Sequence, residues 1–290
     1  MGKCYLCPHM CGADRPGNRG FCGADALKIA RAAPHYHEEP CLSGKNGAGT
    51  VFFSGCPLSC VFCQNHEISD ECKGKEITVG RLAEIIKELE DRGCHNIDLV
   101  SPTPYTDDII AALDIAKPKI PVVWNTSGYE RVPTLKKLRG YVDIYLPDFK
   151  YISPEWAERY SGAADYPGIA SAALEEMLYQ QPEREYGEGG IMKKGVIVRH
   201  LVLPSHRTES IAVLDYLKEN FDITKFTLSL MAQYTPMHRA SEFPEINRTI
   251  TKFEYRSVAE HAQSLGFDCY YQEIASADEK YTPDFDFSGV

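Results

Sequence analysis

The 290-residue sequence lacks the long hydrophobic runs of a membrane protein. Its most apolar stretch, GVIVRHLVLP, is short and is interrupted by Arg199 and His200, whereas a transmembrane helix needs about 20 mostly apolar residues. The first twenty residues, MGKCYLCPHMCGADRPGNRG, contain no apolar core of the kind found in a secretory signal peptide. We therefore expect no membrane association and a cytoplasmic location.

Positive charge is also in short supply. The 31 Lys and Arg residues are outnumbered by 41 Asp and Glu residues, which gives a formal net charge of −10. Non-specific binding to nucleic acid depends on a positive surface that displaces counterions, so we expect no nucleic-acid partner. The hydrophobic content of 43% and the charged content of 25% are those of a soluble globular protein with a sizeable core.

Cysteine, by contrast, is plentiful and unevenly distributed. The sequence has 11 cysteines, and clustered thiols in a reducing compartment are more often metal ligands or catalysts than disulfides. Three cysteines lie within eight residues after position 55, and four more lie near the N-terminus. The two groups are Cys56, Cys60 and Cys63, and Cys4, Cys7, Cys11 and Cys22. Two groups of ligands indicate two sites.

From residue 49 onward, strand-like and helix-like patterns alternate. The expected strands are 50–55, 96–101, 120–127, 142–149, 195–204 and 226–234. The expected helices are 78–93, 106–117, 132–140, 171–181, 208–221 and 250–266. This alternation predicts an α/β fold with a parallel sheet and right-handed crossovers. Six units fit an open, partial (β/α)6 barrel better than a closed barrel of eight strands, with a doubly wound sheet as the alternative.

The same pattern suggests three segments. We expect a small cysteine-rich, metal-binding segment over residues 1–40, the barrel over residues 45–275 and a C-terminal tail over residues 276–290. Ligands of parallel α/β folds bind at the carboxyl ends of the strands. The residues that follow each strand are therefore the candidates for a functional site.

The first of these strands leads directly into a C-x3-C-x2-C loop. Thiolates hold iron–sulfur clusters, and a cubane cluster contains four irons. Three thiolates leave one iron without a protein ligand, and an open metal position distinguishes a reactive site from a structural one, as is well known for zinc. The alternative is a structural zinc ion held by the three cysteines and His66.

This loop, with the aromatic Phe62 directly before its third cysteine, resembles that of the radical S-adenosylmethionine superfamily. Within it, the sequence is similar to the activating enzymes of glycyl-radical enzymes, especially uncharacterised iron–sulfur homologues of the pyruvate formate-lyase activating enzyme. The resemblance covers about residues 45–275. It implies that Cys56, Cys60 and Cys63 ligate three irons of a [4Fe-4S] cluster, that S-adenosylmethionine chelates the fourth, and that Phe62 packs near the adenine.

The ends of the later strands carry further parts of the resemblance. The second strand ends in Ser-Pro-Thr-Pro, where the family has Gly-Gly-Glu-Pro, so Ser101 and Thr103 are expected at the cofactor without the usual carboxylate. The third ends in Asn-Thr-Ser-Gly, where the activating enzymes have Asp-Thr-Asn-Gly, which places Asn125 and Thr126 at the cofactor.

The fourth and fifth strands complete the expected cofactor site. Asp148-Phe149-Lys150 matches the Asp-x-Lys motif of the activating enzymes. Residues two apart on a strand share one face, so Asp148 can accept from ribose hydroxyls while Lys150 offers its charge to a carboxylate. The segment VRHLVLP resembles an Arg-x-x-Val-Ile-Pro motif and places Arg199 and Leu201 at the edge of the pocket, with His200 pointing away.

The N-terminal group has the spacing of a separate metal site. Cys4-x2-Cys7-x3-Cys11-x10-Cys22 supplies four thiolates, which is a closed coordination set. Zinc and an auxiliary [4Fe-4S] cluster are both compatible with this spacing. We expect a structural rather than a catalytic role for this second metal site.

The resemblance implies a function as well. One electron would cleave S-adenosylmethionine to methionine and a 5′-deoxyadenosyl radical, which abstracts hydrogen from a glycine of a glycyl-radical enzyme under anaerobic conditions. The implied partners are that protein substrate and a reductant such as flavodoxin or ferredoxin. The alternatives are a radical enzyme that acts on a peptide or small molecule, and a non-catalytic iron–sulfur or zinc protein.

Overall fold

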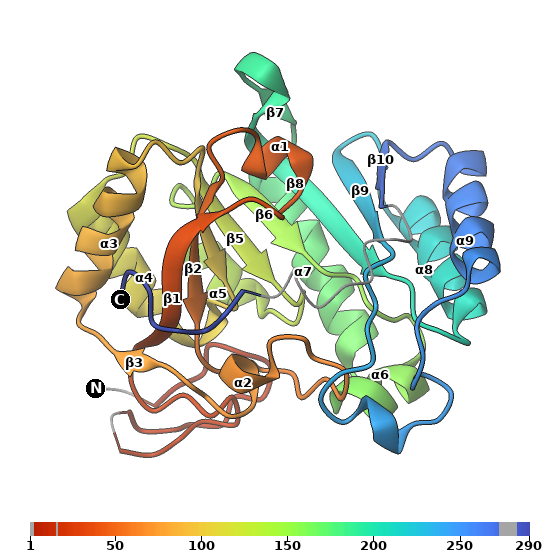
Figure 1. Ribbon diagram of the computed structural model, residues 1–290, viewed down its shortest axis with the longest axis horizontal. Coiled ribbons are helices and arrows are strands. Elements are labelled where there is room, and N and C mark those ends of the chain that lie inside the picture. Colours follow the sequence, from red (N-terminus) through yellow and green to blue (C-terminus); the bar gives the residue numbers. More distant parts are fainter. Residues whose placement is uncertain (1–2, 16, 273–282) are drawn as a thin grey trace.

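The structure is a computed structural model that describes residues 3–15, 17–272 and 283–290. Its centre is a sheet of six parallel strands in sequence order, which follow one another without a reversal (Figure 1). These strands are β2 (Ala48–Phe53), β4 (Ile97–Val100), β5 (Val122–Thr126), β6 (Ile144–Pro147), β8 (Met192–Leu201) and β9 (Phe226–Met231). A doubly wound sheet reverses its strand order at a switch point, so the partial (β/α)6 barrel is confirmed and the doubly wound alternative is wrong.

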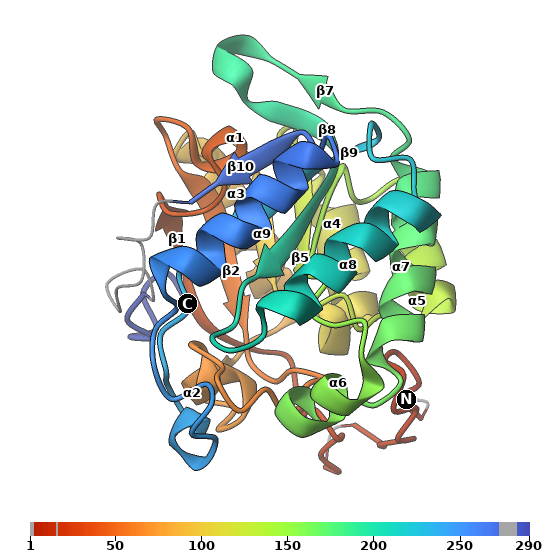
Figure 2. The same ribbon diagram turned by 90° about the vertical axis from the view of Figure 1, so that its right-hand side faces the viewer.

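Six helices follow these strands and cover the outer face of the sheet (Figures 1 and 2). They are α3 (Val79–Asp91), α4 (Thr106–Ala116), α5 (Val132–Lys137), α7 (Tyr166–Gln180), α8 (Arg207–Asn220) and α9 (Lys252–Ser264). Alternating strand residues separate the two faces. Val122 and Trp124 pack in the core that the helices share, whereas Val123 between them packs on the inner face.

The edges of the sheet hold strands that the sequence patterns do not predict. At one edge β1 (Lys28–His35) pairs antiparallel with β2, and β3 (Lys75–Glu76) pairs antiparallel with β1. At the other edge β10 (Cys269–Tyr271) runs parallel to β9. The short β7 (Glu185–Tyr186) lies outside this strand order and pairs antiparallel with the first residues of β8. Because β1 belongs to the sheet, residues 28–35 are part of the barrel fold rather than of a separate cysteine-rich segment.

The inner face is closed at one end by the short helix α1 (Pro40–Ser43). Cys41 and Leu42 of α1 pack against Val123, Ile144 and other inner-face residues of the central strands. In Figure 1, α1 lies at the top, where the parallel strands begin. The helix α2 (His66–Ser69) and the N-terminal cysteine segment lie at the opposite end, where those strands finish.

The two ends of the chain pack against this framework. His9 Nε2 lies 2.8 Å from the carbonyl oxygen of Pro57, and Arg15 Nη1 donates to the carbonyl oxygen of Pro104 at 2.7 Å. The described part of the tail, residues 283–290, packs against β1 and β2, where Phe285 meets Phe52 edge to face. Residues 276–282 of the expected tail lie outside the described residues. Within the described ranges, no helix is both long and apolar enough to cross a membrane.

Candidate active site

The three-cysteine loop leaves the carboxyl end of β2 through a turn that requires glycine. Gly55 has a φ of +89°, and a Cβ at this position would lie 2.5 Å from the carbonyl oxygen of Cys22. The loop then brings Cys56, Cys60 and Cys63 to the wall of one cavity of about 220 Å³. This arrangement gathers three sulfur donors at the end of the barrel where parallel α/β folds bind their ligands.

The thiols of this loop lie in surroundings that suit a bound cluster. Burial raises the pKa of all three thiols, to about 11 for Cys63, while Lys150 acts in the opposite direction. Hydroxyl groups flank two of the sulfurs, with Ser161 Oγ 3.0 Å from Cys60 and Ser69 Oγ 3.2 Å from Cys63. Buried thiolates without a metal are costly, and a cluster would both stabilise their charge and leave one iron open.

The donor set does not favour the alternative of a single zinc ion. His66, the expected fourth ligand, does not line the cavity; its ring stacks on His238 at 4.9 Å, and its Nδ1 lies 3.3 Å from Glu71. Without His66 as a fourth ligand, the three sulfurs around the cavity fit a cluster with one open iron better than one tetrahedral ion.

The cavity collects nearly all of the cofactor-binding residues expected from the sequence. Those on its wall are Phe62, Ser101, Asn125, Thr126, Asp148, Lys150, Arg199 and Leu201. They come from the cysteine loop and from the ends of β4, β5, β6 and β8, in line with the parallel topology. Their role in binding S-adenosylmethionine stays a prediction.

Asp148 is the centre of the charge network in this cavity. Its Oδ2 accepts from Lys150 Nζ at 2.6 Å and its Oδ1 accepts from Arg199 Nε at 2.8 Å. Burial acts to raise the pKa of Asp148, but Arg199 and Lys150 outweigh burial and hold this pKa below its ordinary value. Asp148 in turn raises the pKa of Lys150 despite burial. The pair therefore stays ionised and keeps a cation beside the cysteine loop.

Thr103 is an expected site residue that lies behind the cavity wall. It is buried, and its hydroxyl donates to Glu130 Oε1 at 2.5 Å. The same oxygen accepts from Thr126 Oγ1 at 2.6 Å and from Trp124 Nε1 at 3.3 Å. Glu130 is itself buried and does not line the cavity, so it does not replace the carboxylate missing from the Ser-Pro-Thr-Pro motif. Glu130 joins the ends of β4 and β5, a role that the sequence patterns do not reveal.

The opposite part of the wall comes from the connection between β1 and α1. His35, His37 and Glu38 line the cavity there, although the sequence-based segmentation places them in the metal-binding segment. The run HYHEEP at residues 35–40 is the signal that could have identified them, because it gathers two histidines and two glutamates in six residues. Tyr234, whose ring meets Phe62 edge to face at 5.7 Å, is another wall residue missing from the expected set.

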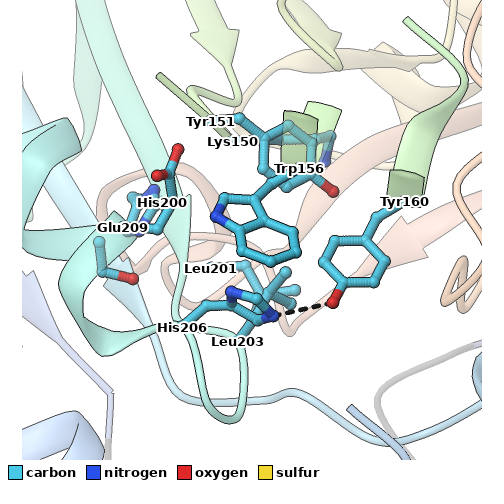
Figure 3. Close-up of a pocket in the computed structure, with 10 residues that line it drawn as sticks. Lys150, Tyr151, Trp156, Tyr160, His200, Leu201, Leu203, His206 and Glu209 are labelled. Atoms are coloured by element: carbon cyan, nitrogen blue, oxygen red, sulfur yellow. Dashed lines mark hydrogen bonds between the residues drawn. The ribbon is translucent and has the colours of Figure 1, made fainter. Parts of the chain in front are cut away.

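A second, much smaller cavity of about 10 Å³ lies behind this wall (Figure 3). Lys150 and Leu201 line both cavities, whereas His200 lines only the small one. His200 Nδ1 lies 2.7 Å from the carbonyl oxygen of Phe149, and Figure 3 shows the hydrogen bond of 2.8 Å between Tyr160 and His206 at the same cavity. His200 therefore points away from the cysteine loop, as the alternation of β8 predicts.

Comparisons with known proteins agree with this geometry. Residues 50–175 match the model of the Radical SAM superfamily. An uncharacterized protein of Methanocaldococcus jannaschii is 34% identical over 281 residues, which cover 93% of this chain and 77% of that protein.

Solved structures share the fold at low sequence identity. The SuiB protein of Streptococcus suis bound to S-adenosylmethionine has a TM-score of 0.51 at 14% identity, over 75% of this chain and 48% of that one. A radical SAM methyltransferase from Sphaerobacter thermophilus has a TM-score of 0.52 at 13% identity, over 78% and 66% of the two chains. Methylornithine synthase has a TM-score of 0.51 at 13% identity, over 74% and 60%. The chain thus spans about half the length of SuiB.

Superfamily membership implies a [4Fe-4S] cluster and S-adenosylmethionine as cofactors, and the cavity described above has the donor set for the former. With its cysteine loop, its partial barrel and its relatives considered together, the chain belongs to the radical SAM superfamily.

Proposed function

We propose that this radical SAM enzyme activates a glycyl-radical enzyme by abstracting hydrogen from a glycine Cα. The observation that carries the radical chemistry is the convergence of three cysteines and the Asp148–Lys150 pair on one cavity. The glycine as target is supported by the resemblance of the Asp-x-Lys and Asn-Thr-Ser-Gly segments to those of the activating enzymes. The reductant, of the flavodoxin or ferredoxin class, is part of the same proposal.

When bound, the cluster and S-adenosylmethionine supply one electron and a 5′-deoxyadenosyl radical, with methionine as the other product. The chain's own residues bind, orient and exclude water. Cys56, Cys60 and Cys63 hold the cluster, and Lys150 supplies a positive charge for the cofactor's carboxylate. The substrate carbon gives up a hydrogen atom and is left as a radical, so no general base is needed.

A labelling experiment tests this proposal. The anaerobic, reconstituted enzyme is incubated with S-adenosylmethionine, a chemical reductant and a glycyl-radical enzyme that carries dideuterated glycine. The proposal predicts 5′-deoxyadenosine that contains deuterium, together with a glycyl radical signal in the electron paramagnetic resonance spectrum. Unlabelled 5′-deoxyadenosine without this signal would instead support the alternative of a peptide or small-molecule substrate. SuiB, crystallised with its precursor peptide, is an example of the superfamily fold with a peptide.

We further propose that Cys4, Cys7, Cys11 and Cys22 hold a structural metal. Burial raises the pKa of Cys7 to about 11 and also that of Cys22. At Cys11 burial has the same tendency, but the amides of Phe21 and Ala13 outweigh it and lower the pKa. Metal analysis of a variant without the three loop cysteines would find either zinc or about four irons. A metal-free variant with freely alkylated Cys4 and Cys7 would contradict this second site.

A further inference from the structure

The part of the cavity formed by the connection between β1 and α1 contains a carboxylate that can accept further hydrogen bonds. Glu38, in the connection between β1 and α1, lines the cavity and retains 15% of its side-chain exposure. Its contacts with donors are long. Arg199 Nη1 lies 3.6 Å from Glu38 Oε2, and Asn125 Nδ2 donates to the same oxygen at 3.4 Å. A carboxylate has about four acceptor positions, so Glu38 can bind another donor from the cavity.

A second, fully buried carboxylate stands beside Glu38 with an unpaired oxygen. Asp98 of β4 is 0% exposed; its Oδ2 accepts from Thr50 Oγ1 at 3.2 Å, and its Oδ1 has no partner among the described residues. Asp98 lies two residues before Val100, which lines the cavity, so both share one face of β4, although Asp98 itself is covered and does not line the cavity. A buried carboxylate oxygen without a close donor is costly, and the Asn125 amide, which acts on Asp98, is shared with Glu38.

The cations of the cavity do not supply a donor to Asp98 Oδ1. Lys150 and Arg199 both bind Asp148, and Arg199 Nη2 donates to Asn125 Oδ1 at 2.7 Å. Of these two cations, only Arg199 forms an ion pair with the neighbouring carboxylates Glu38, Glu39 and Asp98 in the described part of the chain, and this pair, to Glu38, is 3.6 Å long. Burial raises the pKa of all three carboxyl groups, to about 7 for Glu39; the charge of Asp148 adds to this effect at Glu38, and the charge of Glu38 adds to it at Glu39 and Asp98. Burial keeps the nearby His35 neutral near pH 7, since it lowers the pKa of His35 to about 4.

We propose that Glu38, supported by the charge of the buried Asp98, binds a cationic group of the substrate, either a primary ammonium or a guanidinium. The inference rests on the proposed radical chemistry, with the cofactor at the cysteine end of the cavity and the substrate's cation at the Glu38 end. The cation could belong to a free amine or to a Lys or Arg side chain close to the reacting carbon of a polypeptide. Either source presents the same donors to Glu38.

Matched pairs of probes test this inference without any need for turnover. The cluster-loaded enzyme, with S-adenosylmethionine present, is titrated by nuclear magnetic resonance with pentylamine and its neutral isostere pentanol. A second pair consists of acetyl-Gly-Lys-Gly-amide and the same peptide with norleucine in place of lysine. We expect the cationic member of at least one pair to bind at least tenfold more tightly, and the pair that shows this preference identifies the source. Equal affinities within both pairs would overturn the proposal.

Variants assign the preference to the two carboxylates. Glu38→Gln and Asp98→Asn should each reduce the preference for the cation, whereas Glu219→Gln on the exposed end of α8 should retain it. The melting temperature of Glu38→Gln should not fall, because the replacement removes the repulsion between Glu38 and Asp148. If Glu38 served only as a structural ion-pair partner of Arg199, the melting temperature should fall.

The inference is wrong if Glu38→Gln keeps the full preference for the cation, or if it instead weakens S-adenosylmethionine binding tenfold. The preference for cationic probes can also be measured without S-adenosylmethionine. The two proposals can therefore fail separately: an unmodified enzyme that does not bind S-adenosylmethionine would contradict the proposed function and leave the probe result to be judged by itself.

Discussion

At the scale of single residues, Glu130 connects the ends of β4 and β5 through hydrogen bonds behind the cavity wall. One of its oxygens accepts from Thr103, Thr126 and Trp124. Burial raises the pKa of Glu130, and these three donors oppose that effect. Because Thr126 also lines the cavity, this contact fixes part of the cavity wall indirectly.

Replacement of Glu130 should therefore destabilise the fold. Glu130→Ala leaves three buried donors unpaired and should lower the free energy of unfolding by about 3 kcal/mol. Glu130→Gln keeps an acceptor oxygen and should lose less than half as much. Denaturant titration under anaerobic conditions measures both values. Equal stability of the alanine variant and the unmodified protein would show that the donors find other partners.

Lys150 should contribute to cofactor affinity rather than to cluster assembly. A charge-assisted hydrogen bond to a carboxylate is worth about 1.5–3 kcal/mol, so Lys150→Ala should weaken S-adenosylmethionine binding by about ten- to a hundred-fold. Lys150→Arg keeps the charge and should lose less affinity. Iron content should be the same in all three proteins. An unchanged dissociation constant for Lys150→Ala would mean that Lys150 serves only as the partner of Asp148.

His200 should make stability depend on pH. Burial lowers its pKa to about 4, against 6.5 in the unfolded chain. Between these values the unfolded chain binds more protons, so stability falls as the pH drops from 6.5 to 4, by up to about 3 kcal/mol from this group. His200→Gln cannot titrate and should show a shallower loss over this window when unfolding is followed at several pH values. Identical pH profiles would contradict the assignment.

At the scale of elements, regular patterns identify the central units and miss the irregular additions. Thr78 accepts from the Arg81 amide and begins α3, as its sequence predicts. The sequence does not reveal the strand β1, because KIARAAPH has no clear strand alternation and its place in the sheet depends on pairing with β2 and β3. The four-residue α1 is too short for helical periodicity, and its role in closing the barrel depends on tertiary contacts. For the same reason the sequence does not reveal the cavity residues of β1 and of its connection to α1, which are His35, His37 and Glu38.

The N-terminal cysteine segment should stabilise the barrel without being needed for the chemistry. Cys22 and Ala24 are buried in the main core, and His9 contacts the loop at Pro57. Deletion of residues 1–24, which leaves β1 intact, should lower the melting temperature. The cysteine loop should still bind a cluster and cleave S-adenosylmethionine with a chemical reductant. Loss of cluster binding at the loop in a folded deletion variant would contradict a purely structural role.

At the scale of the whole molecule, the two ends of the sheet carry different elements. The cysteine loop and the N-terminal segment lie where the parallel strands finish, and α1 closes the end where they begin (Figure 1). The sequence predicts that the cysteine loop lies at the carboxyl ends of the strands, because ligand binding at those ends is a general rule of parallel sheets. It could not place Glu38 or Glu130, because their positions follow from contacts between segments that are distant in sequence or lack a periodic signal.

The central claim is that Cys56, Cys60 and Cys63 hold a cluster with an iron open to S-adenosylmethionine. The most direct measurement is the electron paramagnetic resonance spectrum of the reduced, anaerobically reconstituted protein before and after addition of S-adenosylmethionine. To remove any signal from the N-terminal site, Cys4, Cys7, Cys11 and Cys22 are replaced by serine in the protein used. The account predicts about four irons per chain and a cluster signal that changes on addition of the cofactor, with both lost in Cys60→Ala. A cluster signal that S-adenosylmethionine leaves unchanged, or one that survives replacement of all three loop cysteines, would contradict it.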